Sequence, residues 1–288
     1  MKHEEWFWTM PELPEVETVR RGLERAMVGK SIERIELRRP DLRWPFPERM
    51  AQRLTGSRVD NAGRLGKYIL LGLSTGDTLI VHLGMSGSFR EFPPGEEGEF
   101  GADTHDHVLL WLDDGNRISY NDPRRFGMMD LARSPEIHSH RLLAAMGPEP
   151  LGNMFNGDCL HGALGNRRGA VKTVLLDQKT VAGLGNIYVS EALWHARIRP
   201  DRPAASLLPG EAGGLVQAIR QVLQAAIDAG GSSLRDHRRL SGETGYFQHS
   251  FSVYGREGED CHRDDCPGRI SRMVQAGRST YLCEDCQG

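Results

Sequence analysis

Apolar residues near the start of the chain recur at helical spacing and predict a helix. Val16, Val19, Leu23 and Met27 fall on one helical face. Pro14 suits the first turn, where its missing N–H is not needed, and the glycine two residues after Met27 would end the helix. The pattern therefore places a helix directly after the segment "MPELPE".

The pattern then changes to the alternation of β-strands. Ile35 and Leu37 alternate with charged residues, and the apolar runs "KYILLGL" and "TLIVHL" flank Gly76-Asp77. A second pair of runs, "HVLLWL" and "RISY", flanks the sequence Asp-Gly at 114–115, which is a strong hairpin signal. We expect an antiparallel sandwich or barrel in the first half of the chain.

Helical spacing returns in the second half. From about Leu142 the segment "GPEPLG" has the composition of a linker, and apolar residues between Leu215 and Ala226 again fall on one face. A glycine-rich tail holds four of the five cysteines. A length of 288 residues agrees with two domains.

The composition is that of a globular protein, with 39% apolar and 26% charged residues. No apolar run approaches the roughly 18 residues of a membrane span, and the first nine residues lack a secretion-signal pattern. We therefore expect a cytoplasmic protein with no membrane partner.

The net charge of -3 argues mildly against a nucleic-acid partner. Basic residues nevertheless cluster at 20–43, 167–172 and 235–239, although solvated surface faces would have the same composition.

Two cysteine pairs in the tail predict a zinc site. Cys261-x4-Cys266 and Cys283-x2-Cys286 are separated by a hairpin-length insert, so two short knuckles can bring four sulfurs to one ion. Because the cysteines fill all four positions, the zinc would be structural, with one ion per chain. A disulfide or free thiols are the alternatives, and His262 could replace one sulfur.

Two turns in the second half carry candidate phosphate contacts. "KTVAGLGNIYVSEALW" places Gly183 and Gly185 directly before a helix, whose backbone N–H groups and Asn186 could meet a phosphate. "QAGR" places Arg278 at the tip of the cysteine hairpin, where an ordinary solvated arginine is the alternative. "GNRRGAVKT" resembles a nucleotide-binding loop, but its second glycine is not adjacent to the lysine, so we exclude nucleotide hydrolysis.

Seven segments together resemble the bacterial formamidopyrimidine-DNA glycosylases: "PELPEVETV", "GKYIL", "HLGMSGSFR", "NDPRRFG", "LLDQKTVAGLGNIYVSEAL", "GYFQHSFSVYGREGE" and "GRSTYLCEDCQ". The resemblance runs from Met10 to Cys286. It implies an α+β protein with an N-terminal antiparallel β-sandwich and flanking helix, a helix-two-turn-helix domain and a zinc-finger β-hairpin. The expected parts are an extension at 1–9, the sandwich domain at 10–141, a linker at 142–155, the helical domain with a lesion lid at 156–250 and the hairpin at 251–288.

The resemblance also implies the catalytic residues. The family's nucleophile is an N-terminal proline, which corresponds to Pro11, and Glu12 corresponds to the general acid that helps to open the sugar ring and release the base. Glu15 matches a supporting carboxylate, with an ordinary first-turn helix acid as the alternative. Lys67 resembles the phosphate-contacting proton donor of β-elimination, and Arg278 resembles the residue associated with δ-elimination.

Further residues correspond to the family's DNA contacts. Met85, Arg124 and Phe126 resemble the group that fills the gap left by a flipped nucleotide, whose glycosidic carbon is unreachable within the stack. By residue type alone, the methionine and the phenylalanine would be core residues. "SGETGYFQHS", with Gly242 and Gly245, corresponds to a lid over the extruded base. The remaining DNA contacts implied are His82, Arg167, Asn186 and His105, the last of which could instead be a polar loop residue.

The expected function is that of a monomeric, bifunctional DNA glycosylase and apurinic/apyrimidinic lyase. It would excise oxidised purines (8-oxoguanine, formamidopyrimidines) from double-stranded DNA and nick the strand, or an abasic site, by β,δ-elimination. The sister enzyme endonuclease VIII, which prefers oxidised pyrimidines, is the nearest alternative.

The start of the chain decides between catalysis and binding alone. Inside the printed chain the nitrogen of Pro11 is a tertiary amide, which cannot act as a nucleophile. We therefore expect translation to start at Met10, followed by removal of this methionine. A retained extension would leave a DNA-binding module without catalytic activity.

Overall fold

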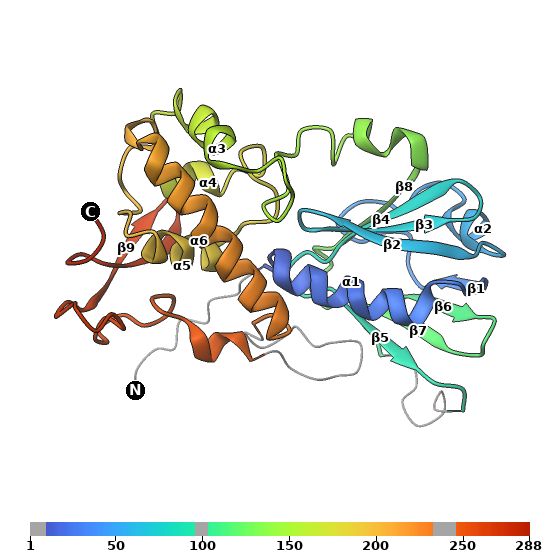
Figure 1. Ribbon diagram of the computed structural model, residues 1–288. Helices are drawn as coiled ribbons and strands as arrows, with labels where there is room; N and C mark the ends of the chain where they lie inside the picture. The colour runs from blue at the N-terminus through green and yellow to red at the C-terminus, as the bar shows by residue number, and fades with distance from the viewer. Residues whose placement is uncertain (1–9, 96–102, 233–245) are drawn as a thin grey trace. The chain divides into compact units, whose positions relative to one another are not determined.

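The computed structural model describes residues 10–95, 103–232 and 246–288, which divide into two units (Figure 1). The first unit holds the described residues up to Ala144 together with 230–232 and Tyr246, and the second holds 145–229 and 247–288. The proposed extension at 1–9, the first half of the predicted lid at 241–245 and the basic cluster at 235–239 lie outside the described residues.

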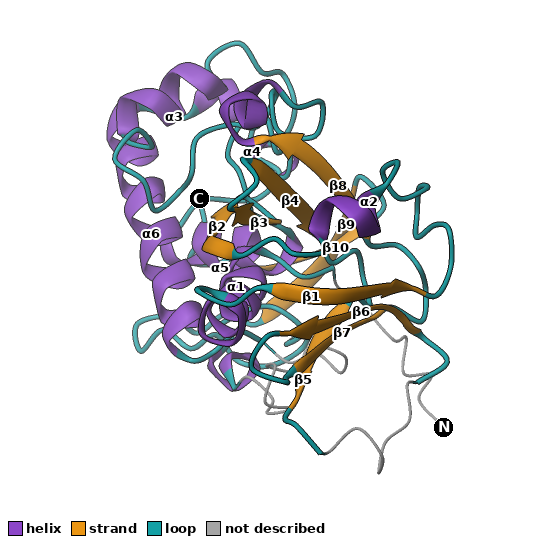
Figure 2. Cartoon of the chain, turned by 90° about the vertical axis from the view of Figure 1, so that its right-hand side faces the viewer, coloured by secondary structure: helices purple, strands orange, loops and turns teal. Residues whose placement is uncertain are grey.

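Two four-stranded antiparallel sheets form the first unit, as the alternating pattern predicts. The turns at Gly76 and Gly115 have positive φ angles of 79° and 84°, which glycine adopts without strain, so both predicted hairpins are present. In Figure 2 the strands are orange. One sheet has the order β2 (Val59–Leu65), β3 (Tyr68–Leu73), β4 (Asp77–His82) and β8 (Met128–Arg133). The other has the order β1 (Ile32–Leu37), β6 (Asp106–Leu112), β7 (Arg117–Asn121) and β5 (Ser88–Phe92).

Helix α1 (Leu13–Met27) covers one open side of the two sheets. It contacts β2, β3 and β5, which include an edge strand of each sheet. The predicted helical face is buried in the same apolar cluster as the strands. Burial of one such side chain contributes about 1.5–3 kcal/mol, so this face fixes α1 on the sheets. The short helix α2 (Met50–Leu54) contacts β1 at the other edge, and the 3-10 helix η2 (Ser134–Ser139) follows β8.

The second unit is built on a long helix, α6 (Pro209–Asp228), which contacts α3 and α5. Its buried face includes the apolar residues that the spacing between Leu215 and Ala226 predicts. The antiparallel hairpin of β9 (Ile270–Gln275) and β10 (Arg278–Cys283) contacts α5 through β10. No helix in the described part of the chain is long and apolar enough to cross a bilayer. The remaining elements are α3 (Gly157–Leu164), α4 (Val171–Leu175), α5 (Asn186–His195), η3 (Ala204–Ser206) and η4 (Phe247–Ser250).

Candidate active site and metal centre

The first turn of α1 positions the two predicted catalytic glutamates. Glu12 precedes the helix, and its backbone N–H donates to Oε2 of Glu15 at 3.0 Å. The other oxygen of this carboxylate, Oε1, accepts from both the backbone N–H and the hydroxyl of Ser232 at 2.8 Å. Both glutamates are buried, with exposed fractions of 2% and 5%. The Glu15 carboxylate therefore holds the backbone beside Pro11, and its place in the first turn also suits the helix dipole.

Lys67 and His82 lie together near the ends of β3 and β4. Lys67 follows the turn glycine between β2 and β3, and His82 ends β4. Burial, together with the positive charges of Lys67 and Arg43, lowers the pKa of His82 to about 4. Its Nδ1 accepts from the backbone N–H of Gly84 at 3.0 Å. At neutral pH the ring is therefore uncharged with its proton on Nε2, which can donate to a phosphate oxygen.

A buried carboxylate, Asp122, joins the two loops that carry the predicted gap-filling residues. Its Oδ1 accepts from the hydroxyl of Ser86 at 2.5 Å, and its Oδ2 accepts from the backbone N–H of Gly127 at 2.8 Å. The Ser86 oxygen in turn accepts from the backbone N–H of Arg124 at 3.1 Å. Burial and the nearby carboxylate of Asp122 raise the pKa of Tyr120 well above its ordinary value.

This network places Met85, Arg124 and Phe126 on adjacent loops. A Cβ on Gly84 would lie 2.3 Å from the carbonyl carbon of Phe126, so the loops approach as closely as glycine allows. The Arg124 guanidinium lies 4.8 Å from the centre of the Phe126 ring, and this ring is 43% exposed. Phe126 is therefore not a core residue. Arg125, between them, has a left-handed φ of 57°, which is rare for a residue with a Cβ.

His105 lies in an exposed turn immediately before β6. The carboxylate of Asp103 accepts from its backbone N–H at 3.0 Å, and its own carbonyl accepts from the backbone N–H of Asp122 at 3.0 Å. The turn is thus bonded to the backbone of Asp122, whose carboxylate joins the two loops that carry the predicted gap-filling residues. An exposed imidazole in this position is available to a partner.

In the second unit, Gln178 holds the glycine turn that precedes α5. Its side chain accepts from the N–H of Gly183 at 2.8 Å and donates to the carbonyl of Leu184 at 2.8 Å. Gly183 has a φ of 86°, which favours glycine. Arg167, the predicted phosphate contact, donates to the carboxylate of Asp177 at 2.7 Å.

The hairpin that carries Arg278 is fixed by two polar side chains of the helices. The ammonium of Lys172, which is fully buried, donates to the carbonyl of Ser279 at 3.0 Å and to the hydroxyl of Thr280 at 2.6 Å. The side-chain amide of Asn186 donates to the same Ser279 carbonyl at 2.9 Å. Arg278 is the first residue of β10, directly before these contacts, so the helices determine its position.

A second buried carboxylate, Glu191 of α5, holds the segment that leads to the hairpin. Its oxygens accept from the backbone N–H groups of Ser252, Val253 and Tyr254 at 2.8–3.0 Å. Burial raises the pKa of Glu191, while these hydrogen bonds oppose the shift. Asp122, Lys172, Gln178 and Glu191 are not among the functional residues that the sequence predicts. The only sign of their importance in the sequence is that each is a polar residue inside one of the quoted segments.

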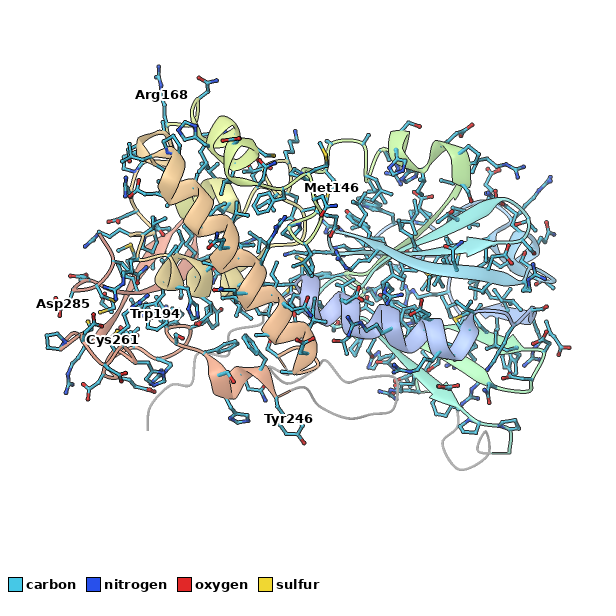
Figure 3. All side chains as sticks on the ribbon, viewed as in Figure 1. Met146, Arg168, Trp194, Tyr246, Cys261 and Asp285 are labelled. Atoms are coloured by element: carbon cyan, nitrogen blue, oxygen red, sulfur yellow. The ribbon has the colours of Figure 1, made fainter. Side chains whose placement is uncertain are left out.

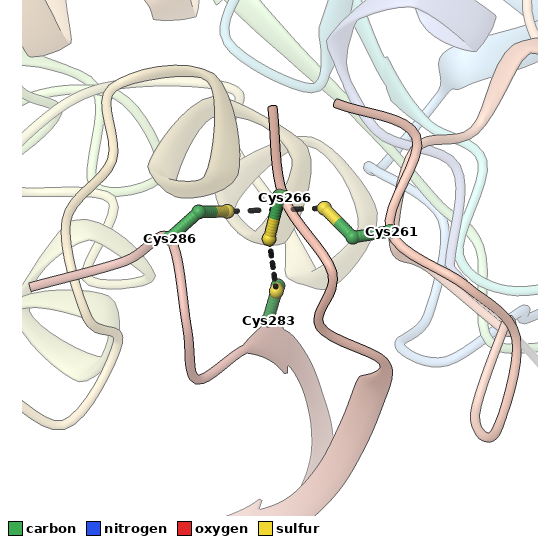
Figure 4. Close-up of side chains that lie close together, drawn as sticks. All are labelled: Cys261, Cys266, Cys283 and Cys286. Atoms are coloured by element: carbon green, nitrogen blue, oxygen red, sulfur yellow. Dashed lines mark hydrogen bonds between the residues drawn. The ribbon is translucent and has the colours of Figure 1, made fainter. Parts of the chain in front are cut away.

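Four cysteines lie together at the end of the second unit (Figure 4). Their sulfurs all lie within 4.8 Å of one another, with 3.8 Å between Cys261 and Cys286 and 3.5 Å between Cys266 and Cys283. Tetrahedral zinc with Zn–S bonds of about 2.3 Å separates its sulfurs by about 3.8 Å, so the cluster fits the ion. The indole of Trp194 lies beside Cys261 (Figure 3). The four sulfurs are consistent with a structural zinc finger.

The fold and these sites define a protein of two units. The first is a β-sandwich preceded by a proline and a helix, and the second is helical and carries a zinc-finger hairpin. Two family models match the chain. They are the formamidopyrimidine-DNA glycosylase N-terminal domain at residues 10–129 and the formamidopyrimidine-DNA glycosylase H2TH domain at residues 146–238.

Individual proteins agree with the family models. A formamidopyrimidine-DNA glycosylase of Ruegeria pomeroyi is 56% identical over 284 residues, which cover 96% of this chain and 100% of that protein. Two solved Lactococcus lactis Fpg structures each cover 96% of this chain and 99% of theirs with a TM-score of 0.86. One is a mutant with Fapy-dG-containing DNA at 37% identity, and the other is a complex with abasic-site DNA at 36% identity. The chain belongs to the formamidopyrimidine-DNA glycosylase family.

Loss of a zinc ligand should remove the metal and the DNA affinity together. Cys283→Ser leaves three sulfurs at the cluster, so we expect purified protein to fall from about one zinc per chain to almost none. Metal analysis and DNA titration of the same samples measure both effects. Cys159→Ser is the matched control, because this cysteine lies in α3 outside the cluster. Full DNA affinity in a metal-free protein would contradict the structural role.

Removal of the Asp122 carboxylate should destabilise the first unit. Asp122→Ala leaves the Ser86 hydroxyl and the Gly127 N–H buried without their acceptor, which costs about 3 kcal/mol of unfolding free energy. Asp113→Ala, in the exposed β6–β7 turn, should change it by less than about 0.5 kcal/mol. Urea unfolding of the free proteins gives both values. Equal losses in the two variants would show that Asp122 does not hold the loops.

Proposed function

We propose that this protein is a bifunctional DNA glycosylase and apurinic/apyrimidinic lyase of base excision repair that acts on oxidised purines. The observation that carries the proposal is the match to formamidopyrimidine-DNA glycosylases over 100% of their length, which begins in the family model at Met10. The solved relative with Fapy-dG-containing DNA supports purine lesions as the substrate class. The relative bound to abasic-site DNA supports the lyase step.

In the proposed mechanism the secondary amine of Pro11 attacks the anomeric carbon of the damaged nucleotide. A new C–N bond forms as the glycosidic bond breaks, and the N–H proton that the Pro11 nitrogen then loses goes to the departing base. Glu12 supplies the second proton, to the ring oxygen, as the sugar opens to the iminium. An α-amino group has a pKa near about 8, so a useful fraction is unprotonated at neutral pH. The resulting iminium supports β-elimination on the 3′ side and δ-elimination on the 5′ side. Lys67 assists the β-elimination, and Arg278 assists the δ-elimination.

DNA binding in this proposal uses both units. Met85, Arg124 and Phe126 fill the space of the extruded nucleotide, and the exposed Phe126 ring is the apolar wedge. The zinc hairpin presents Arg278 to the backbone. His82 donates as a neutral imidazole, and Arg167, Asn186 and His105 contact phosphates or the strand. The protein acts as a monomer in the bacterial cytoplasm on chromosomal DNA.

The catalytic form in this proposal begins at Pro11. The family model starts at Met10, and the relatives align over their full length with 96% of this chain, which supports a functional start at that methionine. Methionine before proline is removed readily, which would free the amine. A chain that keeps residues 1–9 has an amide at Pro11 and would bind DNA without cutting it.

Strand cleavage by two forms of the chain tests the function. The form begun at Met10 should cut duplexes with 8-oxoguanine opposite cytosine far faster than duplexes with thymine glycol, and should leave phosphates on both sides of the gap. The full 288-residue form, with residues 1–9 intact by mass spectrometry, should not cut. A preference for thymine glycol would assign the pyrimidine-specific sister activity instead. Equal cutting by both forms would overturn the proposed nucleophile.

A further inference from the structure

An exposed tryptophan, Trp44, is displayed on a short, well-bonded loop of the first unit. The indole is 37% exposed. The loop is closed by a backbone bond from the N–H of Leu42 to the Trp44 carbonyl at 3.0 Å and by another from the N–H of Phe46 to the Pro40 carbonyl at 3.0 Å. The ring is therefore held on the surface by a defined backbone, and it is not part of the apolar core.

Two arginines lie against this indole. The guanidinium carbon of Arg141 lies 4.8 Å from the ring centre, and that of Arg43 lies 5.9 Å from it. Both distances fall within the range of cation–π attraction. Arg141 also pairs with the carboxylate of Asp130 at 2.9 Å, but its side chain remains 63% exposed. His140 contacts the same carboxylate at 3.4 Å. The exposed Trp44 ring is thus flanked by the positive charges of Arg43 and Arg141.

The loop is connected to the proposed DNA-binding residues. The backbone N–H of Arg43 donates to the carbonyl of Gly127, the residue directly after Phe126, at 3.1 Å. The charge of Arg43 also lowers the pKa of His82, so the guanidinium lies close to the Lys67–His82 pair. Arg43 therefore connects the predicted phosphate contacts with the Trp44 loop, all within the first unit.

We propose that Trp44, Arg43 and Arg141 form a further contact to the DNA backbone, beside the gap-filling loop. In this inference, which rests on the proposed DNA-binding function, the guanidiniums neutralise a phosphate of the flanking duplex and the indole packs on the neighbouring deoxyribose. The occupant is a sugar–phosphate strand because it combines regularly spaced negative charge with a ring that can lie on an aromatic face. The contact carries no base readout, so it adds affinity to any damaged duplex.

The test is a titration of the full-length protein with a duplex that carries a tetrahydrofuran abasic analogue. This analogue needs no reaction at Pro11, so a failure of the proposed chemistry does not affect the result. Trp44→Ala should weaken binding by about fivefold, at the lower end of what an aromatic stacking contact contributes, and Trp44→Phe should keep most of the affinity. Arg141→Ala should lower the slope of log affinity against log salt by roughly 1.

A second arginine–tryptophan pair provides the matched control. The guanidinium of Arg34 lies 3.4 Å from the centre of the Trp111 ring, in a cross-strand pair of β1 and β6. Trp111→Ala and Arg34→Ala should leave both affinity and salt slope unchanged, with urea unfolding used to confirm that all variants are folded. The proposal is overturned if folded Trp44→Ala and Arg141→Ala proteins bind the duplex as the unchanged protein does. It is also overturned if the control pair produces the same losses.

Discussion

The hydrogen bonds of the Glu15 carboxylate determine where the backbone next to Pro11, the proposed nucleophile, lies. One oxygen holds the backbone N–H of Glu12 and the other holds Ser232, a residue more than 200 positions later in the chain. Because Pro11 is joined to Glu12, it is fixed at the start of a helix whose apolar face is packed on both sheets. A nucleophile on a frayed terminus would lose this orientation, and proximity effects in catalysis depend on it.

Buried polar side chains hold the backbone in place at the other sites as well. Asp122 holds together two loops that carry a methionine, an arginine and a phenylalanine, and Lys172 holds the hairpin behind Arg278. Each group lies in a dry environment where an unpaired partner is expensive, so each loop has one favoured position. The four-cysteine cluster lies at the base of the same hairpin, where a bound zinc ion would add a further constraint. Functional side chains on loops can therefore have defined positions without long elements beneath them.

Much of this arrangement could be predicted from local sequence, and some of it could not. The two hairpins are predicted by turn glycines with positive φ, and the helix before the sandwich is predicted by the spacing of its apolar residues. The cysteine cluster is predicted by the two closely spaced cysteine pairs. The buried polar contacts depend on partners far away in the chain, such as Ser232 for Glu15 and Ser279 for Lys172, which no local pattern encodes. For Phe126 the residue type alone gives a wrong prediction, because it indicates a core position whereas the ring is exposed.

We propose that catalysis by this protein requires a free amine on Pro11. The most direct measurement is borohydride trapping of the protein on DNA that contains 8-oxoguanine, followed by mass spectrometry of the peptide that carries the nucleotide. Reduction of the iminium makes the bond permanent, so the adduct marks the nucleophile. We predict an adduct on a peptide that begins at Pro11, and much slower trapping of Pro11→Gly. An adduct on Lys67 in a protein that retains its first nine residues would contradict the account.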